Sequence, residues 1–380
     1  MENLNIIGNK FFELPKNIND TDIITFLEIN FKEYLNLIDL LTGDLGARIK
    51  EERQNLVTLC EQIINSLKCY LNGSPAKAYQ ELGIGISAIN KYSHLSNFDI
   101  VNLGDKKENY YRVRKNDIKI TDKEEMFHIP FDKRYLIKSY RYSISGIPCL
   151  YLANSIYLCW EELNKPALDD LYFSRFQFQS NKLKLMNLAF TPNQFSTIYK
   201  AAIIDKKINF NDINFFIYGI VIWPLSLSCS LLTNNSDRSF VKEYIIPQLT
   251  LEWITNEFGF DGIKYFSTKV KYPNEELVAP FINIALPART LMNSGHCHKL
   301  INLIELTEPK NILDFNNLKK KYENDDTITD ISNWTEMCRE SFLQEIIRQR
   351  KNLDFTYSIF SKLEIELCNL KAKKIQNTYT

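Results

Sequence analysis

The side chains best suited to chemistry lie between residues 110 and 162, in the stretches YYRVR, RYSISGIPCLYLANS and CWEE. They are Arg112, Arg114, Arg141, Tyr151, Glu161 and Glu162. Arginine suits phosphates because its planar guanidinium is always charged, a carboxylate stabilises developing positive charge, and a phenol stacks on aromatic rings. Each also has a structural interpretation: an exposed strand face, a core tyrosine or a solvated helix end. Together they place a guanidinium, a phenol and a carboxylate on adjacent elements of one compact hairpin–helix unit.

The elements that position these residues follow from local patterns. Arg112 and Arg114 alternate on a predicted strand and therefore face the same way. Arg141 precedes a turn at Ser145-Gly146, after which the chain returns as a strand that carries Tyr151. A short helix over 155–163 then ends with the two glutamates. From about residue 110 to 289, such short apolar runs alternate with turns, and a second helix is expected over 241–258, which predicts an α+β unit.

Helices are expected on both sides of this unit. Apolar residues recur at spacings of three and four over 20–41 and 51–71, and Ser74-Pro75 has the chemistry of a helix start, for a helix through residue 82. One or two amphipathic helices are expected over 333–375, after a polar connection over 308–332. The predicted division is an N-terminal helical region, 1–104, a catalytic domain with a central mixed sheet, 105–295, and a C-terminal helical extension, 296–380.

The most apolar stretch runs from residue 213 to 236 and contains no charged residue. Its length raises the alternative of a membrane-spanning helix. Gly219, Pro224 and a series of serines interrupt it, however, and no cluster of lysine or arginine flanks it closely. We therefore expect FFIYGIVIW to form a buried β-strand that ends at Pro224.

Composition excludes several classes of protein. The 380 residues include 46 Lys+Arg and 46 Asp+Glu, and this balance argues against bulk electrostatic binding to nucleic acid or to an anionic membrane, although a local basic patch could survive it. Eight scattered cysteines without a C-x-x-C pair do not resemble a disulfide scaffold. The N-terminus lacks the pattern of a signal peptide. We expect a cytoplasmic protein that binds neither nucleic acid nor membrane.

Familiar catalytic and nucleotide-binding motifs are absent from the sequence, among them G-x-x-x-x-G-K-[ST], G-x-G-x-x-G, H-E-x-x-H and G-x-S-x-G. The tripeptide His296-Cys297-His298 offers soft metal ligands, but a structural zinc site needs four and no further His or Cys lies nearby in the sequence. We expect a loop there and no metal.

The ordered stretches resemble the RES domain family, named for its Arg, Glu and Ser. They are YYRVR, MFHIPF at 126–131, RYSISGIPCLYLANS with CWEE, and FVKEYIIPQLTLEWI followed by FDGIKYFS. The resemblance covers about residues 110–289 and, more weakly, 63–82. This chain departs from the family in having Tyr142-Ser143 after Arg141, where Trp and Asn are frequent, and in its added helical segments.

The resemblance implies a mixed α/β fold similar to the ADP-ribosyltransferases, with NAD held in a cleft. It implies a bacterial toxin that cleaves the nicotinamide–ribose bond of NAD by phosphorolysis or hydrolysis and is neutralised by an antitoxin. Carried over by motif, the catalytic residues would be Glu162, Arg141, Tyr151 and Ser267. The residues that contact NAD would be Arg112, Arg114, Arg141, Tyr151 and Glu161, with Arg114 as the substitute for Arg112 and Glu161 as the substitute for Glu162.

The chemistry expected of these residues is as follows. Glu162 would stabilise the oxocarbenium-like ribose as nicotinamide leaves, and Arg112 and Arg141 would grip the two phosphates. Tyr151 would stack on nicotinamide, and Ser267 would orient the ribose or the attacking phosphate or water. NAD is then the substrate, inorganic phosphate is an optional co-substrate, and no metal is needed.

Two other functions fit the same sequence. The first is transfer of ADP-ribose to a macromolecule. The second is a catalytically silent binding protein whose terminal helices contact a partner. An antitoxin or regulatory protein is a further expected partner, and the terminal helices allow a homodimer.

Overall fold

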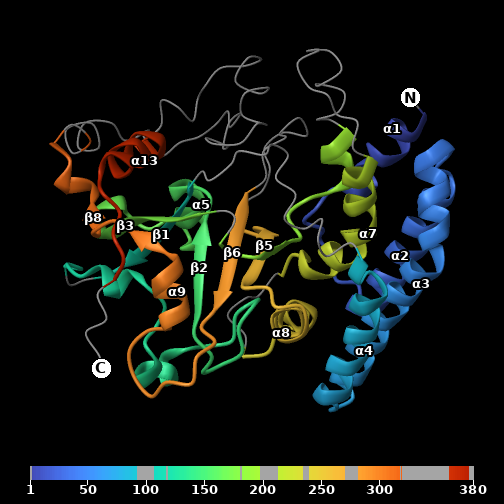
Figure 1. Ribbon diagram of the computed structural model, residues 1–380, viewed down its shortest axis with the longest axis horizontal. Helices are drawn as coiled ribbons and strands as arrows, with labels where there is room; N and C mark the ends of the chain where they lie inside the picture. The colour runs from blue at the N-terminus through green and yellow to red at the C-terminus, as the bar shows by residue number, and fades with distance from the viewer. Residues whose placement is uncertain are drawn as a thin grey trace. The chain divides into compact units, whose positions relative to one another are not determined.

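The computed structural model describes residues 2–91, 107–116, 119–179, 182–196, 213–233, 239–269, 281–316, 318 and 359–375. The chain forms two compact units, each built from several segments (Figure 1). The helical unit comprises Met1–Asp99, Ser139–Tyr142 and Leu185–Thr268, and the sheet unit comprises Ile100–Lys138, Ser143–Lys184 and Lys269–Thr380. The predicted division into residues 1–104, 105–295 and 296–380 remains a prediction.

The helical unit is built from six α-helices and a short pair of parallel strands within the described ranges. The helices are α1 (Glu2–Ile7), α2 (Ile23–Asp39), α3 (Gly43–Leu71), α4 (Pro75–Ala88), α7 (Ile213–Cys229) and α8 (Ile245–Glu257). The strands are β4 (Leu185–Asn187) and β5 (Gly262–Phe266). The predicted helices over 20–41, 51–71 and from Pro75 are confirmed, with α3 beginning earlier and α4 ending later than expected.

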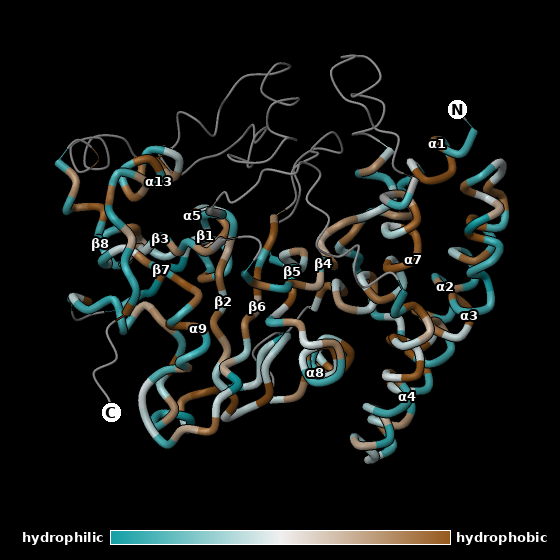
Figure 2. Tube along the Cα trace, in the orientation of Figure 1, coloured by the Kyte–Doolittle hydropathy of each residue, from teal (hydrophilic) through white to brown (hydrophobic). Residues whose placement is uncertain are grey.

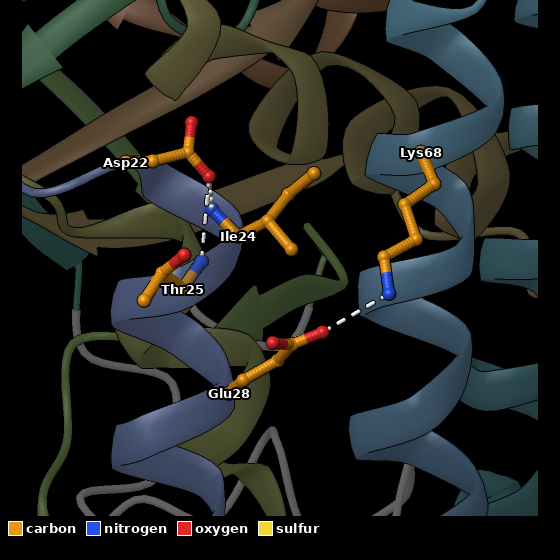
Figure 3. Close-up of polar contacts among 5 residues, drawn as sticks. All are labelled: Asp22, Ile24, Thr25, Glu28 and Lys68. Carbon is orange, nitrogen blue, oxygen red and sulfur yellow. Dashed lines mark hydrogen bonds and ion pairs between the residues drawn. The ribbon is translucent and has the colours of Figure 1, made fainter.

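Local chemistry explains where α2 begins and how it is tied to α3. The carboxylate of Asp22 accepts hydrogen bonds from the backbone N–H groups of Ile24 and Thr25, at 3.1 and 3.4 Å (Figure 3). It thus satisfies two of the donors that a helix start leaves unpaired. One turn further on, Glu28 pairs with Lys68 of α3 at 3.0 Å (Figure 3). Both partners are about half exposed, so this pair orients the helices more than it stabilises them.

The apolar stretch after residue 213 is a helix, and the predicted β-strand is wrong. It forms α7, and Pro224 lies inside it. The side chains on all sides of α7 are buried, including those of Ile220, Val221 and Trp223. A helix that is apolar all round shows no 3.6-residue pattern, and this is why the sequence did not distinguish it from a buried strand. Among the described residues, no helix has the length and apolar content needed to cross a membrane.

A second residue compensates for the proline in α7. Pro224 has no N–H to donate to the carbonyl of Ile220, four residues earlier. The hydroxyl of Tyr34 in α2 donates to that carbonyl at 2.8 Å, and the Tyr34 ring stacks on Trp223 with centroids 5.2 Å apart. The freed backbone acceptor is therefore satisfied inside the core.

The sheet unit contains an antiparallel array in the order β6-β2-β1-β3-β7, with β8 also paired to β3. The strands are β1 (Lys107–Lys115), β2 (Cys149–Ala153), β3 (Leu171–Gln179), β6 (Ile282–Pro287), β7 (Glu305–Leu306) and β8 (Lys310–Asn311). The α-helices are α5 (Ile156–Glu162), α9 (His298–Leu303) and α13 (Ile359–Asn369). The predicted strands at YYRVR, CLYLA, GIKYF and INIAL are confirmed, whereas β3 was not predicted.

The C-terminal helix α13 belongs to the core of the sheet unit. Its residues Ile359, Phe360, Leu363 and Leu367 are buried in one cluster with α5 and one face of β1 and β3. Glu364, which is 3% exposed, accepts the Ile156 N–H at the start of α5 at 2.8 Å. Helix α13 is therefore part of the core of the sheet unit. The remainder of the predicted helices over 333–375, like the predicted connection beyond residue 318, lies outside the described residues.

The predicted fold class is confirmed. Helices precede and follow the strands along the chain, and the strand pairs include both parallel and antiparallel ones, so the protein is α+β with mixed strand pairing. Figure 2 shows hydrophobic residues along the strands and on the helix faces that meet within each unit. The strands and helices that carry the candidate site residues are therefore held in place by apolar burial within each unit.

Candidate functional site

Glu162 is held at the end of α5 by a residue of β6. Helix α5 begins because Ser155 accepts the Leu158 N–H at 3.1 Å, and seven residues later it ends at Glu162. The Glu162 carboxylate accepts a hydrogen bond of 2.7 Å from Nδ2 of Asn283. Asn283 is 7% exposed, whereas Glu162 is half-buried. The carboxylate is thus fixed in position and still reaches solvent.

Tyr151 lies on the same sheet face as the amide that holds Glu162. On the β2–β6 ladder, Tyr151 stands opposite Ala285 and Ala153 stands opposite Asn283. Alternate residues of a strand share a face, so Tyr151 and Asn283 are diagonal neighbours, with a typical separation of about 7–8 Å. The Tyr151 hydroxyl donates to Oγ of Ser143 at 2.8 Å. A phenol on this sheet face and a carboxylate held from a diagonal position of the same face are thus each fixed by a second side chain; we call them the Glu162–Tyr151 site.

Glu161 occupies a different environment from its neighbour. Its carboxylate accepts a hydrogen bond from the Tyr157 hydroxyl and pairs with Lys165 at 3.0 Å. Glu161 is 9% exposed. Burial, with the adjacent carboxylate, raises the pKa of Tyr157 well above its usual value. These contacts tie Glu161 to the packing of α5, whereas Glu162 is held by Asn283 of β6.

The two arginines of β1 lie on the opposite face of the sheet from Tyr151. Tyr111 stands opposite Ala153, so Tyr111 shares the face of Tyr151, and its neighbour Arg112 points the other way. Arg112 donates to the carbonyl of Phe127 at 2.8 Å, and Arg114 donates to the carbonyl of Glu125. Burial lowers the pKa of Arg114. The alternation predicted for YYRVR is confirmed, and both arginines leave β1 on the face opposite to that of Tyr111.

Arg141 and Ser267 belong to the helical unit. Arg141 is 7% exposed and donates to the carbonyls of Cys229 and Leu231 at 3.1 and 2.9 Å, and to Oγ1 of Thr268 at 3.1 Å. Cys229 is the last residue of α7, so the guanidinium lies where the helix dipole is negative. Ser267 is fully buried next to Thr268 in the chain. Arg141 therefore caps α7 and lies close to the segment that carries Ser267.

A buried histidine pair was not predicted. The rings of His128 and His296 lie 5.0 Å apart, and Nε2 of His128 accepts the Cys297 N–H at 2.9 Å while its Nδ1 contacts the carbonyl of Ile129 at 2.8 Å. Burial is the main cause that lowers the pKa of His128 to about 3, with smaller contributions from His296 and two arginines, Arg112 and Arg134. His128 is therefore neutral at physiological pH. In the described part of the chain, no three His, Cys, Asp or Glu side chains gather as metal ligands.

Sequence reasoning missed the residues that position the Glu162–Tyr151 site. Asn283 lies inside an apolar strand, FINIAL, and this buried polar residue among apolar ones was the signal that was available. Ser143 follows Arg141 by two residues but carries no local signal, because only the folded turn brings it to Tyr151.

Comparisons with known proteins give one informative match. No family model matches the chain, and no solved structure matches it. A curated protein of Bacillus subtilis (strain 168), named "Putative toxin YopC", is 29% identical over 301 residues. The match covers 76% of this chain and 65% of that protein, so the chain spans less than two thirds of its relative's length. The chain is similar to a protein whose name describes a toxin, and the comparisons specify no reaction.

Proposed function

We propose that this protein is a toxin-like enzyme that degrades NAD, as the resemblance to the RES family implies. One observation carries the proposal: a half-buried carboxylate, Glu162, is fixed by Asn283 on the same sheet face as a fixed phenol, Tyr151. The relative named as a toxin supports the toxin-like part. The reaction is cleavage of the nicotinamide–ribose bond, with phosphate or water as the acceptor.

The two groups match what this cleavage requires. As nicotinamide departs, positive charge develops on the ribose, and a carboxylate held nearby lowers the energy of that state without having to reorganise. The Asn283 amide donates to one oxygen of the Glu162 carboxylate and holds it in place. The Tyr151 ring offers a face for nicotinamide, and its hydroxyl is anchored to Ser143.

The phosphate-binding residues are a separate part of the proposal. The two predicted forks, Arg112 and Arg141, already donate to backbone carbonyls. Arg141→Lys keeps the charge but loses the planar fork. If Arg141 grips a phosphate, the KM for NAD rises in this variant while the thermal unfolding temperature changes little. If Arg141 only caps α7, stability falls and the KM of the folded protein is unchanged.

The test uses two adjacent glutamates as a matched pair. Purified protein is incubated with NAD, with and without phosphate, and NAD, nicotinamide and the ribosyl product are separated by chromatography. Glu162→Gln should lower turnover about 100-fold or more, because the focused negative charge is lost while the shape is kept. Glu161→Gln should retain most of the activity, because its partners are Tyr157 and Lys165.

The outcomes separate the alternatives. Consumption of NAD that depends on Glu162 supports the proposal, and the product identifies water or phosphate as the acceptor. Label transferred from NAD to a protein or nucleic acid would instead assign ADP-ribosyl transfer. A folded protein that neither binds nor consumes NAD would refute the proposal and leave a binding protein.

A further inference from the structure

We infer that one end of the sheet unit is a docking surface for an anionic lipid bilayer. The surface is formed by three segments: 131–138, 143–148 and 288–297. Its exposed apolar side chains are Tyr135, Leu136, Ile144, Ile147 and Leu291. Its cations are Lys133, Arg134, Lys138 and Arg289. We call it the apolar–basic surface, and it does not depend on the reaction proposed above.

Hydrogen bonds bring the three segments together. Arg134 donates to the carbonyl of Gly146 at 3.1 Å, and the Gly146 N–H donates to the carbonyl of Ile137 at 3.2 Å, which joins the first two segments. The Phe131 N–H donates to the carbonyl of Gly295 at 2.8 Å and joins the third. These bonds fix the three segments to one another, so the surface is preformed.

The three segments also share a position relative to the strands. The turn over 143–148 leads into β2, and the segment over 288–297 leaves β6. The Ala288 N–H donates to the carbonyl of Pro148 at 2.9 Å, which extends the β2–β6 ladder by one bond. Figure 1 shows β6 ending, and β2 beginning, at the lower end of the sheet unit. The surface therefore lies at one end of this strand pair.

The exposed apolar residues of this surface form a group, unlike apolar residues scattered singly over a protein surface. Tyr135 is 81% exposed, Leu291 is fully exposed, and Leu136, Ile144 and Ile147 are each between 43% and 53% exposed. Single exposed apolar residues are ordinary, but a group on adjoining turns marks an interaction site. Figure 2 shows hydrophobic and hydrophilic residues next to one another in the loops at this end.

The positive charge of the three segments identifies the partner as an anionic bilayer. The three segments contain four cations and one acidic residue, Asp132, whose carboxylate accepts the Gly295 N–H at 3.1 Å. Exposed apolar side chains on a 3-10 helix and two loops, a tyrosine among them and nearby cations match a bilayer interface, where rings sit at headgroup level and lysines meet anionic headgroups. A groove would favour a peptide instead, but these side chains come from the 3-10 helix Phe131–Leu136 and from two loops. The net charge of the whole chain is zero, so the attraction is local.

The experiment measures binding of the full chain to vesicles by co-sedimentation. One set of vesicles contains phosphatidylcholine with phosphatidylglycerol, and the other contains phosphatidylcholine alone. We expect binding to the anionic vesicles that weakens with added salt. Lys133→Glu with Lys138→Glu should lower the partition coefficient about tenfold or more. Tyr135→Ser with Leu136→Ser should also lower it, because the inserted apolar area is lost.

A matched control uses exposed apolar residues elsewhere. Ile29→Ser with Leu40→Ser changes two side chains of α2 and its end, which are 61% and 59% exposed, and should leave binding unchanged. All variants are on the surface, and circular dichroism verifies that they fold. The inference is overturned if the anionic vesicles do not retain the protein, or if the surface variants bind as the parent does. A change of oligomeric state in the surface variants, without vesicle binding, would also overturn it and assign the surface to a protein contact.

Discussion

The contact between Tyr34 and the proline-interrupted helix α7 leads to a quantitative prediction. Tyr34 is fully buried, and its hydroxyl donates to the Ile220 carbonyl that Pro224 leaves without a helical donor. Tyr34→Phe keeps the ring and its stacking on Trp223 but removes the donor. A buried acceptor without a partner costs about 1–3 kcal/mol, and we expect the free energy of unfolding to fall by that amount.

The second arm of this test restores the missing donor. Pro224→Ala supplies a backbone N–H at position 224 that can donate to the Ile220 carbonyl within the helix. In that background Tyr34→Phe should cost less than about 1 kcal/mol, so the double-mutant cycle should show a coupling of about 1–2 kcal/mol. Urea unfolding followed by circular dichroism measures all four proteins. Equal costs of Tyr34→Phe in both backgrounds would show that the hydroxyl does not compensate for the proline.

Three further predictions concern packing and pH. Phe360→Ala should destabilise the sheet unit by about 3–5 kcal/mol in urea unfolding, because Phe360 is fully buried in the core, whereas Ile365→Ala on the exposed side of α13 should be nearly neutral. Gly83→Ala should cost about 1–3 kcal/mol, because a Cβ there would overlap the Trp253 ring; in a Trp253→Leu background the cost should shrink. The folded state keeps His128 neutral down to its pKa of about 3, whereas the unfolded chain takes up that proton near pH 6.5, so stability falls as the pH drops through this window. Between pH 7 and pH 5 the parent should lose about 2 kcal/mol more than His128→Gln, and equal losses would contradict the assignment.

Local sequence patterns were sufficient to predict most of the individual helices and strands. Apolar spacing predicted α2 and α3, Ser74-Pro75 predicted the start of α4, and the runs that became β1, β2, β5 and β6 were recognised from their β-branched and aromatic residues. These signals are local, because capping and strand propensity depend on a few neighbouring residues. The two glutamates at the end of α5 were placed correctly for the same reason.

The sequence did not indicate that two adjacent glutamates would make different contacts. Glu161 and Glu162 are adjacent and chemically identical, yet Lys165 and Tyr157 engage one of them and Asn283 engages the other. Asn283 is more than a hundred residues away, so only the pairing of β2 with β6 selects Glu162.

The sequence alone determined the α+β class, the amphipathic N-terminal helices and the positions of the candidate site residues along the chain, because these depend on local propensity and apolar periodicity. The tertiary structure decided that the apolar stretch after residue 213 is a helix, since burial on every side removes the periodicity that separates helix from strand. It also decided that Arg112 faces away from Tyr151, because a strand's register with its neighbours, which is set by contacts distant in sequence, determines the face that each side chain occupies.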